Sequence, residues 1–220
     1  MSGKSRYDLI IFDWDGTLMD SASAIARSII AACHDLALPA PSEARARHVI
    51  GLGLQEALTY AVPALSEAHY PRMVERYRYH YLAADRDLTL FPGVQELVAG
   101  LAAEGRMLGV ATGKSRKGLD RALGRTELAA HFASTRCADE CFSKPHPEML
   151  EQIMDELGVE RKRTLMVGDT THDLNMARNA GVDGLAVAFG AHPRAALEAL
   201  EPLAVLDSPA AYTDWFRCNL

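Results

Sequence analysis

Short apolar runs alternate with amphipathic stretches along much of this chain of 220 residues. The first run, Leu9–Phe12, is long enough for a strand buried on both faces and too short for a core helix. Further runs also predict strands: Met107–Ala111, the weaker Phe132–Ser134, Thr164–Val167 and Leu185–Phe189. We therefore expect a sheet whose central strands are buried.

Helical periodicity fills the gaps between these runs. The predicted helices are Val94–Ala103, Ser115–Leu123, Pro147–Leu157 and Leu174–Ala180. Gly105, Gly158 and Gly181 stand where three of the helices should end. Strands that alternate with helices of this length indicate right-handed βαβ units and a parallel, Rossmann-like sheet flanked by helices.

Residues 19–86 interrupt the alternation. Apolar positions recur there at helical spacing with no strand between them, in segments at Ala22–Leu36, Ala44–Ile50, Leu54–Ala61 and Ser66–Ala84. Pro92 and Gly93 mark the return to the alternating pattern, and the tail from 195 to 211 has ordinary helix and loop composition. The chain is thus predicted to form an α/β core domain from residues 1–18 and 87–220, with an all-helical domain inserted at 19–86.

Composition and charge narrow the classes of function. A net charge of -6 and a pI near 5.7 argue against a duplex-binding surface, so no nucleic-acid partner is expected. The opening residues are polar and mildly basic, and no segment approaches the roughly 20 apolar residues that span a bilayer. We expect a soluble cytoplasmic protein.

The four cysteines are scattered along the chain, at Cys33, Cys137, Cys141 and Cys218. A chain of this size does not need disulfides to fold, so free thiols are expected. Cys137 and Cys141 have histidines nearby, but their spacing matches no standard zinc pattern.

Two aspartates follow the first strand directly. Asp13 and Asp15 stand just past its carboxyl end, where open α/β sheets bind their ligands, and Gly16 allows a tight turn beside them. Trp14 lies between them, and strand alternation predicts that its side chain points the other way and packs.

A possible phosphate cradle follows the second strand. Thr112 and Gly113 end the run GVAT and open a helix, where a hydroxyl and exposed N–H groups would face an anion. The same pair is also consistent with a simple turn. Lys144 precedes another helix start, where a lysine opposes the helix dipole, so an anionic partner or a solvated surface position would explain it.

Two more carboxylates follow the fourth strand. Asp169 and Asp173 are four residues apart, which would place them on one side of a helical turn, where they repel each other unless a cation lies between them. Each also has a structural interpretation alone, as a cap or as a complement to the helix dipole. A cluster of oxygen ligands favours Mg²⁺, so His172 and His146 are expected beside the site or at the surface rather than as ligands.

Together these segments resemble the ordered motifs of the haloacid dehalogenase-like hydrolase superfamily. The resemblance rests on FDWDGTL at 12–18, Thr112 after a strand, Lys144 before a proline, and GDTTHD at 168–173. The helical insert resembles the cap domain of the subgroup that includes phosphoglycolate phosphatases and β-phosphoglucomutases. Haloacid dehalogenases lack an acid at the second aspartate position, so with Asp15 this chain resembles the phosphotransferases.

The resemblance implies a role for each motif residue. Asp13 would be the nucleophile that forms an aspartyl-phosphate, and Asp15 would protonate the leaving alkoxide and then activate water. Mg²⁺ would be held by Asp13, the backbone carbonyl of Asp15, Asp169 and, directly or through water, Asp173. The transferred phosphoryl group would be bound by Thr112, Gly113 and Lys144.

The function that this resemblance implies is hydrolysis of a small phosphorylated metabolite, with 2-phosphoglycolate as the leading substrate. Arg45, Arg47 and His48 in the insert could bind a carboxylate, although charge on a solvated helix face is the favoured interpretation of these residues. The alternatives are a phosphomutase of the β-phosphoglucomutase type and a non-catalytic binding protein. The motifs name no protein partner.

Overall fold

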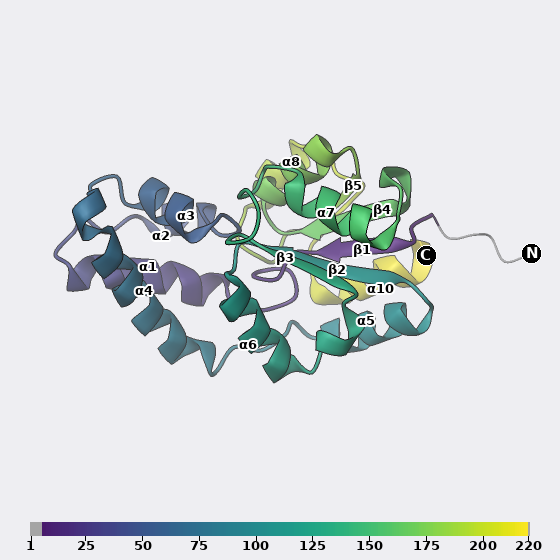
Figure 1. The fold of residues 1–220 in the computed structure, drawn as a ribbon, viewed down its shortest axis with the longest axis horizontal. Coiled ribbons are helices and arrows are strands. Elements are labelled where there is room, and N and C mark those ends of the chain that lie inside the picture. The colour runs from purple at the N-terminus through teal and green to yellow at the C-terminus, as the bar shows by residue number, and fades with distance from the viewer. Residues whose placement is uncertain (1–5, 220) are drawn as a thin grey trace, which may run out of the picture.

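A parallel sheet with helices on both faces lies beside a separate group of helices in the computed structural model, which describes residues 6–219 (Figure 1). The strands are β1 (Leu9–Phe12), β2 (Met107–Thr112), β3 (Ser134–Cys137), β4 (Thr164–Gly168), β5 (Asp183–Val187) and β6 (Val205–Leu206). They pair in the order β3-β2-β1-β4-β5-β6, and each pairing is parallel. The predicted α/β, Rossmann-like fold is therefore confirmed. Residues 1–5 and 220, at the two ends of the predicted core domain, lie outside the described residues.

The strand β1 occupies the middle of the sheet, between β2 and β4. Phe12 at its end pairs with Val110 of β2 and with Val167 of β4. The chain runs outward through β2 and β3 and then returns to β4, so the direction of winding reverses between β1 and β4. Such a switch point opens a crevice at the carboxyl ends of the strands, which is where these folds bind ligands.

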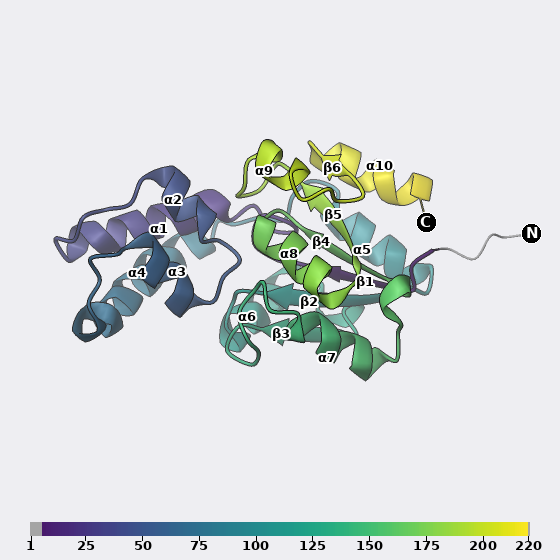
Figure 2. The ribbon, with the colours of Figure 1, turned by 90° about the horizontal axis from the view of Figure 1, so that it is seen from above.

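Helices cover the two faces of the sheet (Figures 1 and 2). They are α5 (Val94–Ala103), α6 (Arg116–Thr126), α7 (Glu148–Leu157), α8 (Thr171–Ala180), α9 (Arg194–Glu198) and α10 (Pro209–Asn219). Ile10 and Phe12 of β1 pack with residues of α5, α6 and α10, whereas Leu9 and Ile11 pack with residues of α7 and α8. Successive side chains of a strand point to opposite faces, so an unbroken apolar run is what a strand between two helical layers requires.

The helical group is built from the inserted segment. Its helices are α1 (Ala22–Asp35), α2 (Glu43–His48), α3 (Leu54–Ala61) and α4 (Tyr70–Asp85), with a short 3-10 turn at Glu67–His69. Ile29, Leu58 and Met73 are buried in a separate core of this group. Met19 and Leu90 form an antiparallel bridge, so the two crossings between insert and sheet lie side by side. We refer to residues 19–86 as the cap; the domain boundaries themselves stay a prediction.

Some element boundaries match the sequence pattern and others differ from it. The bounds of α3 and α5 agree with the predicted ranges, and Gly105, Gly158 and Gly181 have positive φ angles after their helices. The third strand begins at Ser134 and not at Phe132, because the Phe132 ring instead packs against other aromatic rings of the core. The short strand β6 was not predicted, since two residues carry no periodic signal.

Other expectations concern individual side chains and the chain as a whole. The side chain of Trp14 is fully buried in the core of the sheet, which confirms that it packs. The four cysteines are free thiols, as expected. Over residues 6–219, no helix combines the length and the apolar character that a membrane crossing needs.

Candidate active site

Three aspartates meet at the switch point of the sheet. Asp13 follows β1 directly, Asp169 follows β4, and Asp173 lies in the first turn of α8. One carboxylate oxygen of each lies within 4.8 Å of the others, and all three side chains are buried. The strands set this arrangement, because the Asp13 N–H donates to the Val167 carbonyl at 2.9 Å and keeps the two strand ends adjacent.

Lys144 joins this group as its buried cation. Its Nζ lies 2.6 Å from Asp13 Oδ1 and 2.7 Å from Asp173 Oδ1, and its side chain is fully buried. The surface interpretation of Lys144 is therefore wrong. Burial alone would lower the pKa of Lys144, but the charges of the two aspartates raise it above its ordinary value. His146, two residues on, is exposed.

The carboxylate of Asp169 is held by donors from two loops. The Thr17 hydroxyl donates to Oδ1 at 2.9 Å, and the Ala191 N–H donates to Oδ2 at 2.7 Å. These partners come from the turn after β1 and from the loop after β5, far apart in the sequence. They fix the direction of one carboxylate within the group.

The position of Asp173 follows from the start of α8. Thr170 is the N-cap, and its backbone N–H donates to Asp173 Oδ2 at 3.0 Å in a capping box. Asp169 precedes this cap and is not part of a helical turn, so the expectation that both aspartates share a helix face is wrong. They converge because the chain turns sharply from strand to helix between them. Asp173 both caps the helix and belongs to the carboxylate group.

The charges in this group do not balance. The three carboxylates face one ammonium, which leaves two negative charges uncompensated when all are ionised. Burial raises the pKa of Asp13 to about 7 and that of Asp169 well above its usual range. For Asp173 burial also acts to raise the pKa, but the charge of Lys144 outweighs it and the pKa is lowered.

One oxygen of the group has no partner. Asp13 Oδ2 is buried and accepts no hydrogen bond from residues 6–219. Buried polar atoms are seldom left in this condition in native proteins. Several buried carboxylate oxygens, an excess of negative charge and one unpartnered oxygen fit a hard divalent cation such as Mg²⁺. The predicted contact of the Asp15 backbone carbonyl with the ion stays a prediction.

Gly16 lets the chain pass close to Asp169. Its φ angle is +86°, and a Cβ there would lie 2.2 Å from Asp169 Oδ2. We expect Gly16→Ala to lower the free energy of unfolding by about 1–3 kcal/mol and to displace Asp169, which weakens Mg²⁺ binding. Gly105→Ala is the matched control, because Gly105 has φ +82° with open space around it. Calorimetric Mg²⁺ titration of both variants is the measurement; equal Mg²⁺ affinities would contradict this account of Gly16.

Asp15 faces a different partner from the other aspartates. Its Oδ1 accepts hydrogen bonds from the Ser21 hydroxyl at 2.6 Å and from Lys114 Nζ at 2.9 Å. Lys114 also donates to the Tyr81 hydroxyl at 2.8 Å, and burial raises the pKa of Tyr81 to about 12. Tyr81 belongs to α4 of the cap, so Lys114 connects the cap to Asp15. Sequence reasoning missed Lys114, and only its place directly after Thr112 and Gly113 could have drawn attention to it.

Thr112 and Gly113 end β2 beside β1. Thr112 is fully buried, and its hydroxyl accepts a hydrogen bond from the Lys114 N–H at 3.2 Å. A Cβ on Gly113 would lie 2.5 Å from the Leu52 carbonyl oxygen and 2.6 Å from that of Gly51. The absence of a side chain at Gly113 therefore lets the cap loop approach this edge of the sheet. Their predicted contact with a phosphoryl group stays a prediction.

Further contacts hold the cap against the sheet. The Gly53 N–H donates to the Ser143 hydroxyl at 2.8 Å, next to Lys144. At the end of α2, the His48 carbonyl accepts from Nε2 of His172 at 2.7 Å and of His192 at 3.0 Å. With the pair formed by Lys114 and Tyr81, these contacts describe a cap that is closed over the carboxylates.

The arginines of α2 do not reach the site. Arg45 Nη2 donates to the Tyr60 carbonyl at 2.7 Å, and Arg47 donates to the Ser23 hydroxyl at 2.7 Å and to the Gly190 carbonyl at 3.2 Å. Neither lines the cavity at Asp15. Both arginines therefore stabilise the cap and its contact with the loop after β5.

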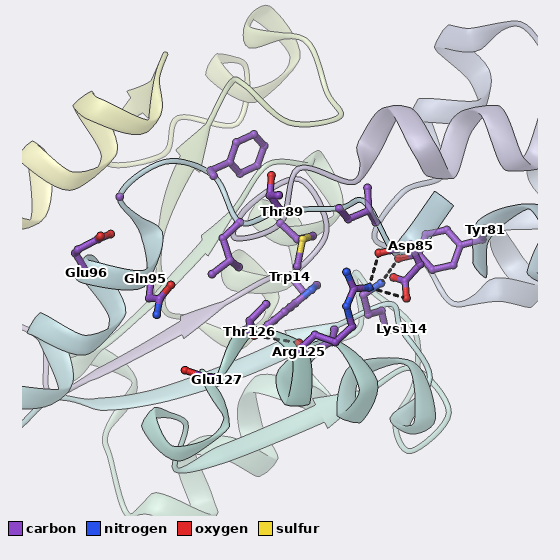
Figure 3. A pocket seen from close by; sticks show the side chains of 16 residues that line it. Trp14, Tyr81, Asp85, Thr89, Gln95, Glu96, Lys114, Arg125, Thr126 and Glu127 are labelled. Atoms are coloured by element: carbon purple, nitrogen blue, oxygen red, sulfur yellow. Dashed lines mark hydrogen bonds and ion pairs between the residues drawn. The ribbon is translucent and has the colours of Figure 1, made fainter. Parts of the chain in front are cut away.

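Two cavities lie between cap and sheet, and Lys114 and Tyr81 line both. The larger, of about 700 Å³, opens at Asp15, and we call it the cap cavity. The smaller, of about 440 Å³, is shown in Figure 3. There Arg125 of α6 forms an ion pair with Asp85 at 3.1 Å, at the end of the last cap helix (Figure 3).

A family of hydrolases and proteins named as phosphatases are similar to this chain. The profile of the family described as "Haloacid dehalogenase-like hydrolase" matches residues 10–187. A protein of Dickeya dadantii named "Probable phosphatase IndB" is 39% identical, in an alignment covering 91% of this chain and 89% of that protein. A phosphoglycolate phosphatase of Salmonella typhimurium is 30% identical, with 90% and 88% covered.

Solved structures extend the similarity to the whole fold. A crystal structure described as a predicted phosphoglycolate phosphatase from Haemophilus somnus has a TM-score of 0.84 and 26% identity. The superposition covers 99% of this chain and all of the other.

Proposed function

This chain belongs to the haloacid dehalogenase-like hydrolases, and we propose that it is a Mg²⁺-dependent phosphoric monoester hydrolase that acts through an aspartyl-phosphate. The observation that carries the proposal is the buried group of three carboxylates and Lys144, in which one Asp13 oxygen has no partner. Relatives named as phosphatases support the same reaction class.

The metal would be held by Asp13, Asp169 and Asp173, with the Asp15 carbonyl as a further ligand. Bound there, Mg²⁺ would neutralise charge on the phosphoryl oxygens and so allow an anionic nucleophile to approach. Lys144 Nζ, which contacts both Asp13 and Asp173, adds a positive charge on the same side. The Thr112 hydroxyl and the Gly113 N–H would hold the phosphoryl oxygens.

Asp13 would act as the nucleophile, and Asp15 would act as the general acid and then the general base. One carboxylate oxygen of Asp13 attacks phosphorus, and the bond from phosphorus to the substrate alcohol oxygen breaks as Asp15 delivers a proton to that oxygen. Asp15 then takes a proton from water, the water oxygen attacks phosphorus, and the aspartyl-phosphate bond breaks to release phosphate. Asp15 lines the cap cavity, where a leaving alcohol would lie.

The names of relatives make 2-phosphoglycolate the first substrate to test. A panel of phosphorylated metabolites that includes 2-phosphoglycolate, sugar phosphates and nucleotides should release phosphate with Mg²⁺ and not with EDTA. Absence of phosphate release from every ester under both conditions would overturn the proposal. Interconversion of sugar phosphate isomers without net release of phosphate would instead indicate the phosphomutase.

A further inference from the structure

The cap cavity is large for a two-carbon substrate. Its volume of about 700 Å³ equals the space of roughly twenty water molecules at about 30 Å³ each. Cavities of this size hold ligands with several rings. The cap contacts the sheet at Ser143, Lys114 and the histidines, so this volume belongs to a cap that rests on the sheet.

The part of the cavity wall that the cap contributes is mainly aliphatic and aromatic. Residues 70, 74, 77 and 81 of α4 follow helical spacing and present Tyr70, Val74, Tyr77 and Tyr81 along one side. The rings of Tyr77 and Tyr81 are stacked, with centroids 5.9 Å apart and planes 17° apart. Other cap helices and their loop also line the cavity with apolar side chains: Ile25, Ile29, Ile50, Leu54 and Leu58.

The row of aromatic side chains on α4 ends with Tyr81, at the end of the cavity where Asp15 lies. The Tyr81 hydroxyl accepts from Lys114, which holds Asp15. Tyr77 is half-buried beside it, and burial raises the pKa of the Tyr77 hydroxyl, so Tyr77 remains neutral. A flat group joined to the phosphate by a short linker would therefore lie against Tyr77 while its ester oxygen faces Asp15.

The interior offers little to a carboxylate next to the phosphate. Lys114 is the nearest cation to Asp15, and it is already bound to Asp15 and Tyr81. The other cationic residues that line the cavity lie nearer the solvent: Arg78 and Lys117 are exposed, and Arg121 is half-buried and paired with Asp85. Burying the carboxylate of glycolate against apolar groups without a partner would be unfavourable.

We propose that the alcohol part of the substrate carries a flat, apolar or aromatic ring system that packs between α4 and the aliphatic side of the cap cavity. This inference rests on the proposed phosphatase function and names the substrate class for it. 2-Phosphoglycolate would then be a poor substrate, because it leaves most of the cavity unfilled and its carboxylate would lie near Lys114, which is already paired with Asp15.

The test compares esters of primary alcohols, so that the chemical step is similar in all of them. Wild-type protein with Mg²⁺ is assayed with ethyl phosphate, 2-phosphoglycolate, benzyl phosphate and 2-naphthylmethyl phosphate. We expect kcat/KM to rise along the ring series and to exceed that of 2-phosphoglycolate by about tenfold or more for the naphthyl ester. The gain should appear mainly in KM, because the ring contacts persist from bound substrate to transition state.

A cavity-filling variant localises the effect. Val74→Trp should lower the ratio of kcat/KM for naphthylmethyl phosphate to that for ethyl phosphate by about tenfold. Leu54→Trp fills the same cavity from α3 and serves if the first variant folds poorly, as judged by its melting temperature. Ala83→Trp is the matched control, since Ala83 is exposed on the same helix and does not line the cavity. It should leave the ratio unchanged.

The outcomes separate this inference from the function on which it rests. Higher kcat/KM for 2-phosphoglycolate than for both ring esters would overturn the substrate class while leaving the phosphatase intact. A ratio that Val74→Trp and Leu54→Trp do not change would also overturn it, because the rings would then bind elsewhere. If no ester releases phosphate, both the phosphatase and the inference fail.

Discussion

Replacement of Asp13 by asparagine is expected to abolish phosphate release, with a loss in kcat of about 10⁴-fold or more. An amide cannot form the acyl phosphate, although it keeps the size and shape of the side chain. The matched control is Asp20→Asn, because Asp20 is exposed in the same segment and contacts none of the three clustered carboxylates. Steady-state release of phosphate from the best ester measures both variants.

The same variant should not unfold the protein. Burial raises the pKa of Asp13 to about 7, well above its ordinary value, so folding favours its protonated form. In metal-free wild type, the raised pKa of Asp13 contributes to the free energy of unfolding fully below about pH 4, and this contribution is lost as the pH rises towards 7. Asparagine does not ionise, so the Asp13→Asn variant does not lose stability in this way. Its melting temperature in EDTA should therefore fall less than that of wild type between these pH values; an equal or larger fall would contradict the burial of an ionising Asp13.

Lys144→Met should reduce both stability and turnover. The variant leaves the buried carboxylates of Asp13 and Asp173 without their cation, and removing one partner of a buried ion pair costs about 3–5 kcal/mol in the free energy of unfolding. Turnover should fall by about 10²–10³-fold, because a charge aimed at the reacting group is lost. Denaturant unfolding in EDTA and phosphate release with Mg²⁺ are the two measurements.

The stability effect of Lys144→Met has a specific signature. A divalent cation supplies positive charge to the same carboxylates, so Mg²⁺ should raise the melting temperature of the variant more than that of wild type. Lys162→Met is the matched control, since Lys162 is an exposed lysine in a 3-10 turn. A Lys144→Met protein that is as stable as this control in EDTA would show that Lys144 does not compensate the buried acids.

The elements that carry the carboxylates could be predicted because their signals are local. An apolar run ending in Asp13, and another ending at Gly168 before Asp169, each contain the strand and its terminal acid within a few residues. A strand buried on both faces requires an unbroken apolar run, and parallel strands have their carboxyl ends at the same edge of the sheet. Helix ends at Gly158 and Gly181 were predictable for the same reason, since each glycine has a positive φ angle.

The residues that support the site could not be predicted, because their partners are distant in the sequence. Thr17 and Ala191 hold Asp169 from two separate loops, and no pattern in either loop indicates this. Tyr81 and Lys114 contact each other only because the cap closes on the sheet. The segment around β3 was misplaced because its half-buried polar residues, Thr135 and Arg136, carry no apolar signal at the edge of a sheet.

The most direct test of the central claim is to trap the covalent intermediate. Enzyme turning over its best ester with Mg²⁺ is quenched at a series of times, treated with borohydride, which reduces an acyl phosphate to an alcohol, and mapped by mass spectrometry. The account predicts homoserine at position 13, dependent on both substrate and Mg²⁺. Phosphate release through a complete time course with position 13 unmodified, or with another residue reduced, would contradict it.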